Sequence, residues 1–145
     1  MGLLSRALNR NLLGKGKYEM EKEATETKVC FTTKASIADV KEALRVYVIV
    51  EDRSAITLVS HKLVIENQTD EFIKYANRNK MLANFEAVLL FSQEESLHSQ
   101  FLFTHWIQND GVAVEAEKML NLRNAVISAF RHADPDVSIT YEANK

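Results

Sequence analysis

At 145 residues, with 46% hydrophobic and 26% charged residues, the chain has the length and composition of one globular domain. The single cysteine excludes an intramolecular disulfide framework, and the net charge of −2 gives no general attraction for nucleic acid. The longest apolar runs, residues 46–50 and 87–91, are far shorter than the roughly 20 residues of a transmembrane helix. Because Arg6 and Arg10 also interrupt any signal-peptide-like run, we expect a cytoplasmic protein.

Residues 1–17 are predicted to form a basic amphipathic arm ahead of a single domain at residues 18–145. The arm carries four basic residues and no acidic one, so the remainder of the chain is acidic. Its leucines recur at four-residue spacing between arginines, a pattern typical of an amphipathic helix: Leu4, Arg6, Leu8, Arg10 and Leu12. A helix of this kind can bind an anionic membrane surface or a partner's groove. The favoured interpretation is a leader that is frayed or docks on its own domain.

The domain opens with residues 18–26, which are highly charged and are expected to be a solvated lead-in. Alternation over residues 28–33 predicts a strand. Ser36 is a suitable N-cap, and apolar residues at helical spacing follow it, so we expect a short helix over residues 36–45.

The middle of the chain predicts a hairpin followed by a helix. Residues 46–51 and 56–66 are rich in β-branched side chains and are separated by a polar turn, which favours two paired strands. Thr69 can cap the next segment, and its apolar residues favour a helix over residues 70–80.

The last third predicts a second hairpin, a long helix and an edge strand. Residues 85–92 and 97–108 alternate around the polar turn SQEES, and Gly111 makes the next corner. An apolar stripe over residues 112–132 indicates the long helix, which Pro135 ends. Residues 137–141 can add a last strand.

No arrangement of residues in the sequence indicates catalysis. His98 and His105 lie an odd number of residues apart on one predicted strand, so alternation places them on opposite faces unless a bulge intervenes. Serine–histidine neighbours on strands point apart, and no glycine-rich loop is available for a phosphate. We therefore expect a non-enzyme with no catalytic residues, no metal and no cofactor.

The more useful signal is apolar surface on the second hairpin. If helices cover only one side of the sheet, the other face exposes apolar and aromatic side chains among polar ones, a mixture typical of interfaces. The alternative is that another helix covers this face internally. The predicted contact surface comprises Val88, Leu90, Leu102, Thr104, His105 and Trp106.

Two segments carry a resemblance to a known family. YANRNKMLANFEAVLLFSQEE predicts a helix end that leads into a strand opening with Phe85 and Ala87, and NDGVAVEAEKML is a Gly–Val corner that starts the last helix. With the order helix–hairpin–helix–hairpin–long helix over residues 36–132, the chain resembles the YbjN-like domains and, more broadly, the type III secretion chaperone-like fold. The resemblance implies a non-catalytic binding module that often dimerises through a helix or sheet surface.

Together these patterns predict an α+β fold with an antiparallel twisted sheet packed by two or three helices, in the order β-α-β-β-α-β-β-α-β. The favoured function is a protein-binding module, chaperone-like or regulatory, that forms a homodimer; its protein partner is not named by the sequence. One alternative is a small-ligand-binding protein with a START-like or cystatin-like cavity between sheet and C-terminal helix, lined by Thr104, His105 and Trp106. Another is a peripheral membrane protein anchored by residues 3–13.

Overall fold

The chain folds into an antiparallel sheet with helices on one of its faces. The structure is a computed structural model, which describes residues 15–109 and 112–144. The helices are α2 (Lys15–Glu26), α3 (Ile37–Tyr47), the short 3₁₀ helix η2 (Arg53–Ala55) and α4 (Ala116–Ala133). The strands are β1 (Thr27–Thr33), β2 (Lys62–Gln68), β3 (Phe72–Arg78), β4 (Ala83–Gln93), β5 (Leu97–Trp106), β6 (Gln108–Asn109), β7 (Val112–Ala113) and β8 (Ser138–Ala143).

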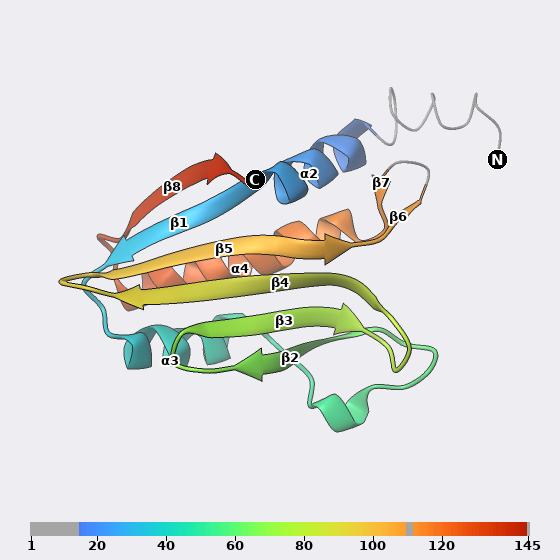
Figure 1. Cartoon of the computed structure of the whole chain (residues 1–145), viewed down its shortest axis with the longest axis horizontal. Coiled ribbons are helices and arrows are strands. Elements are labelled where there is room, and N and C mark those ends of the chain that lie inside the picture. The colour runs from blue at the N-terminus through green and yellow to red at the C-terminus, as the bar shows by residue number, and fades with distance from the viewer. Residues whose placement is uncertain (1–14, 110–111, 145) are drawn as a thin grey trace.

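Six of these strands form one open sheet in the order β2-β3-β4-β5-β1-β8 (Figure 1). The run from β2 to β5 is a simple meander. β1 comes from the start of the chain and lies between β5 and β8, with Val29 opposite Phe101 on one side and Tyr141 on the other. β6 and β7 pair separately as a two-stranded extension.

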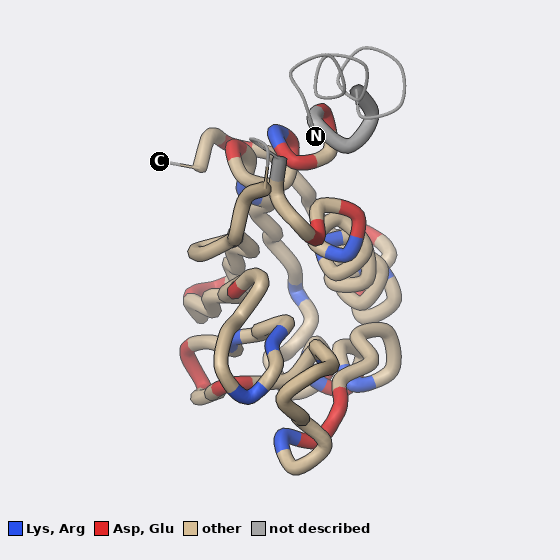
Figure 2. The backbone as a smooth tube through the Cα atoms, turned by 90° about the vertical axis from the view of Figure 1, so that its right-hand side faces the viewer, with Lys and Arg blue, Asp and Glu red and all other residues tan. Residues whose placement is uncertain are grey.

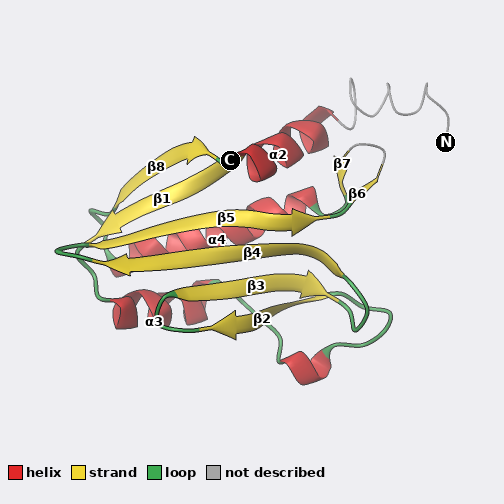
Figure 3. Ribbon diagram, viewed as in Figure 1, coloured by secondary structure: helices red, strands yellow, loops and turns green. Residues whose placement is uncertain are grey.

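The helices α3 and α4 lie behind the sheet in Figure 3, and the view turned by 90° in Figure 2 places them together on one side of the strands. Alternation explains this one-sided arrangement: along β4, Phe85, Ala87 and Leu89 point to the helices and are buried, whereas the residues between them are half-buried. Phe31 of β1 stacks on Phe130 of α4 with ring centroids 3.9 Å apart. These contacts place the core between the sheet and α4.

The fold class predicted from the sequence is confirmed: the chain is α+β, with an antiparallel sheet and a long C-terminal helix. The strand at 28–33, the second hairpin and the last edge strand are also present. Ser36 caps α3 as expected, since its hydroxyl accepts a hydrogen bond from the Asp39 amide at 3.1 Å.

Three sequence-based predictions are wrong. Residues 70–80 form the strand β3 and no helix, because β2 and β4 supply hydrogen-bonding partners on both of its sides. The predicted hairpin of 46–51 with 56–66 is absent, since β2 pairs with β3 and residues 48–50 form an extended connection. The supposed lead-in at 18–26 belongs to α2, where Ala24 is fully buried.

The predicted arm at residues 1–17 overlaps α2 only at its end. Its residues Leu4, Arg6, Leu8, Arg10 and Leu12 lie outside the described residues. Within the described part of the chain, no helix is long and apolar enough to cross a membrane.

Candidate functional site

The face of the sheet opposite the helices carries a group of adjacent apolar side chains. In the strand register Phe72 lies opposite Leu90, and Val88 lies opposite Leu102, so the four residues share this face across three strands. Leu90 is 41% exposed and the other three are half-buried. We call Phe72, Val88, Leu90 and Leu102 the open-face cluster.

Only part of this face is uncovered. Val64 of β2 and Ala76 of β3 point to the same side as the open-face cluster, yet both are fully buried. The connection that contains η2 covers them, and there Arg53 and Arg78 both pair with Glu66. The uncovered area is therefore made by β4, β5, β1 and β8, together with the start of β3.

Charged groups of both signs lie around the cluster on the same face. The Lys74 ammonium lies 2.8 Å from the Glu86 carboxylate, and the His98 ring lies 3.2 Å from Glu94. Lys28 and Glu142 add one charge of each sign to the same face, so the surroundings of the cluster do not present one dominant sign.

The thiol of Cys30 also lies on this face and donates to the Glu142 carboxylate at 2.9 Å. Burial, followed by this hydrogen bond, raises the pKa of Cys30 from 9.0 to about 11. The thiol is therefore protonated near neutral pH and is a weak nucleophile.

Five of the six predicted contact residues lie on the open face: Val88, Leu90, Leu102, Thr104 and His105. The placement of Trp106 was wrong. A β-bulge sets both Thr104 and His105 against Glu86, so that the alternation shifts and Trp106 lies opposite the inward-facing Phe85. Trp106 consequently packs against the core from the helix side.

The same bulge also changes the predicted faces of His98 and His105, which the sequence placed on opposite sides of the strand. His98 lies opposite Ser92 and His105 lies opposite Glu86, so both point to the open face. They are still separated by about 20 Å along the strand, which is too far for one metal ion. Among the described residues, no group of three or more potential metal ligands is found.

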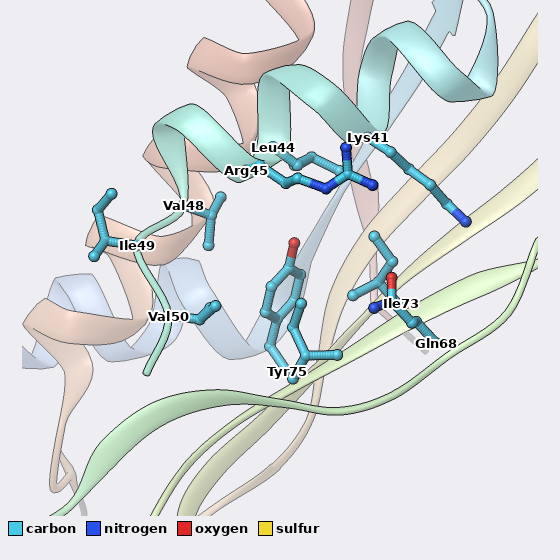
Figure 4. Close-up of a pocket in the computed structure, with 10 residues that line it drawn as sticks. Lys41, Leu44, Arg45, Val48, Ile49, Val50, Gln68, Ile73 and Tyr75 are labelled. Atoms are coloured by element: carbon cyan, nitrogen blue, oxygen red, sulfur yellow. The ribbon is translucent and has the colours of Figure 1, made fainter. Parts of the chain in front are cut away.

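On the helix side, a cavity of about 200 Å³ lies between α3 and the strands β2 and β3 (Figure 4). We call it the α3 pocket. Its lining is mostly apolar, with basic and amide groups at its edge, and comprises Lys41, Leu44, Arg45, Val48, Ile49, Val50, Ile65, Gln68, Ile73 and Tyr75. Sequence analysis missed this pocket, because it placed Ile73 and Tyr75 on a helix.

A second hollow of about 300 Å³ lies between α4 and the sheet, where the predicted alternative placed a ligand cavity. Leu122 and Ala125 of α4 face Leu63, Asn77 and Phe85 of the sheet across it. None of the lining residues proposed from the sequence, Thr104, His105 and Trp106, contributes to this hollow. Val48 and Ile49 line both hollows and separate them.

Comparison with known proteins gives no family. No protein-family model matches the sequence, and no curated protein matches it. The solution structure of the Aha1 dimer from Colwellia psychrerythraea is similar over 73% of this chain and 92% of that chain, with 10% identity and a TM-score of 0.48. A likeness of this degree implies neither a shared function nor a shared assembly.

Proposed function

We propose that this chain is a non-catalytic protein-binding module, chaperone-like or regulatory, that forms a homodimer through the open face of its sheet. The observation that supports the proposal is the open-face cluster, four apolar side chains on neighbouring register positions of a sheet face that no described helix covers. Adjacent exposed apolar groups surrounded by polar ones are typical of protein interfaces.

The charges on the open face favour a second copy of this chain as its binding partner. Since Lys74 is paired with Glu86, and Lys28 and Glu142 carry opposite charges on the same face, two copies can approach without strong like-charge repulsion. A partner selected by charge would require a surface of one dominant sign, and this face has none.

The dimensions of the face indicate how tight the dimer can be. Strands are about 4.8 Å apart and rise about 3.3 Å per residue, so the uncovered area measures roughly 20 by 30 Å, or about 600 Å² on each copy. The total is about 1,200 Å², at the lower end of the range for stable interfaces. We therefore expect a monomer–dimer equilibrium in the micromolar range.

Leu102→Asp tests the proposal, because it places a charge in the middle of the cluster without touching the helix-side core. We expect sedimentation velocity from 1 to 100 μM (order-of-magnitude range) to give a dimerisation constant at least about tenfold weaker for this variant. Ser128→Asp, which adds the same charge on the exposed side of α4, is the matched control and should dimerise like the unmodified chain.

Two results would count against the proposal: an unmodified chain that stays monomeric throughout, or a Leu102→Asp variant that dimerises normally. Far-ultraviolet circular dichroism of each variant checks that the fold is retained. Trp106→Asp is unsuitable for this experiment, because Trp106 packs against the core.

The proposal does not depend on a family. The resemblance to YbjN-like domains rested on the element order helix–hairpin–helix–hairpin–helix, and β3 takes the place of the middle helix. Membership of that family stays a prediction, as do the cytoplasmic location and the membrane-binding arm.

A further inference from the structure

The α3 pocket has the apolar walls of a small-molecule site. Leu44 of α3 and Val48 and Val50 of the following connection form one side, and Ile65 of β2 and Ile73 of β3 form the other. Figure 4 shows Leu44, Val48, Val50 and Ile73 around a space beneath α3. An apolar ring or short chain is the part of a ligand that such walls accommodate.

One polar group points into this space from the sheet. Tyr75 of β3 is only 1% exposed, and its hydroxyl points toward α3 (Figure 4). Among the described residues this hydroxyl has no hydrogen-bonding partner, and it is not one of the fully buried polar atoms that lack one. Burial raises the pKa of Tyr75, so the phenol remains a proton donor at any ordinary pH. The hydroxyl is therefore open to the pocket, where the acceptor of a ligand can take the place of water.

The edge of the pocket is positively charged. Lys41 and Arg45 lie one helical turn apart on α3, and both line the pocket. The Lys41 ammonium donates to the Thr69 carbonyl oxygen at 3.1 Å and lies 3.8 Å from the carboxylate of Asp70, which is fully exposed. Arg45 pairs with Glu42, and both of these side chains are about 70% exposed. Exposed pairs of this kind are weak, so the carboxylate of a ligand can compete for either cation.

The size of the cavity limits the ligand. A volume of about 200 Å³ is somewhat larger than the roughly 150 Å³ of an engineered cavity that binds benzene. A six-carbon ring or chain and one carboxylate fill a volume of this size.

From the walls, the unpaired hydroxyl and the basic edge, we propose that the α3 pocket binds a small amphipathic monocarboxylate, of the size of benzoate or hexanoate. The apolar part lies against Leu44 and Ile73. The carboxylate accepts a hydrogen bond from Tyr75 and faces Arg45 at the edge. This site is on the helix side of the sheet, so it is separate from the open face and independent of dimerisation.

Titration of the 15N-labelled full chain with benzoate, followed by amide resonances, tests the proposal. We expect the amides of residues 44–50 and 73–75 to shift, with a dissociation constant on the order of 1 mM for so small a ligand. Tyr75→Phe and Arg45→Gln should each weaken benzoate binding by at least about fivefold. Arg131→Gln, which removes an exposed arginine at the far end of α4, is the matched control and should bind like the unmodified chain.

Benzene serves as a second probe, because it has the same ring without the carboxylate. Equal shifts with benzene in the unmodified chain and in Tyr75→Phe would show that the cavity persists in the variant. The proposal is overturned if benzoate at about tenfold above the expected dissociation constant shifts no amide around the pocket. It is equally overturned if benzoate binds with the same affinity to the unmodified chain, Tyr75→Phe and Arg45→Gln.

Discussion

The stacked rings of Phe31 and Phe130 give the clearest prediction about stability. The two rings are nearly parallel, at 7°, with centroids 3.9 Å apart, and they are 1% and 0% exposed. Phe130→Ala removes a ring that joins α4 to β1, and fully buried Phe→Ala substitutions cost about 3–5 kcal/mol. Since domains of this kind have total stabilities of about 5–15 kcal/mol, the variant should remain folded but only marginally so.

Urea unfolding followed by circular dichroism measures this loss of free energy. In thermal unfolding the melting temperature should fall by about 10–20 °C. A double-mutant cycle of Phe31→Leu and Phe130→Leu should give a coupling energy of about 0.5–1.5 kcal/mol from the aromatic contact itself. Phe72→Ala is the matched control. Phe72 is half-buried on the open face, so its loss should cost less than half as much. A loss below about 2 kcal/mol for Phe130→Ala, or one equal to that of Phe72→Ala, would refute the reasoning.

Three further substitutions or measurements follow from local contacts. Because the pKa of Cys30 is raised to about 11, the thiol should react with iodoacetamide at pH 8 about 100-fold more slowly than an ordinary thiol, and Glu142→Gln should speed the reaction. Hydrogen bonds, above all from the Thr33 hydroxyl, hold the pKa of Asp134 below 3.8, so the stability it contributes is present above pH 3.8 and is lost as pH falls through its lower native pKa. Asp134→Asn should therefore lower the melting temperature at pH 6, and the difference from the unmodified chain should shrink as the pH falls below 3.8. Ser36→Ala should cost about 1 kcal/mol in urea unfolding, because α3 loses its cap.

Each of these expectations has a contrary result. Cys30 labelling at the rate of a free thiol would mean that the Glu142 contact and the burial do not persist in solution. Equal melting temperatures for Asp134→Asn and the unmodified chain at pH 6 would show that the Asp134 carboxylate does not stabilise the loop. A Ser36→Ala variant that unfolds at the same urea concentration would show that the cap contributes nothing measurable.

The second hairpin and α4 could be predicted because one periodicity dominates each. Along β4, buried residues including Phe85, Ala87 and Leu89 alternate with more exposed ones from Ala83 to Ser92, which only a strand satisfies. β3 has seven residues, and there Phe72, Ile73 and Ala76 fit the spacing of a helix as well as Ile73 and Tyr75 fit that of a strand. The segment forms a strand because β2 and β4 pair with it on either side, and such tertiary pairing cannot be derived from the local sequence.

The candidate surfaces were predicted only in part for a related reason. The open face of β4 and β5 follows from alternation, and Val88, Leu90 and Leu102 lie where the pattern placed them. The bulge at Thr104 and His105 has no sequence signal such as a glycine, so the position of Trp106 could not be derived. The α3 pocket depends on β3, and its key residue Tyr75 was assigned to the wrong element.

The position of β1 between β5 and β8 has a consequence for synthesis on the ribosome. β1 is made first, yet its neighbours in the sheet come from residues 97–106 and 138–143. At 5–20 residues per second, the roughly 60 residues between β1 and β5 take about 3–12 s to translate. During that interval β1, which contains Val29 and Phe31, has no β5 to pair with. The meander from β2 to β5 can assemble earlier, so β1 is expected to join a sheet that is already formed, followed by β8.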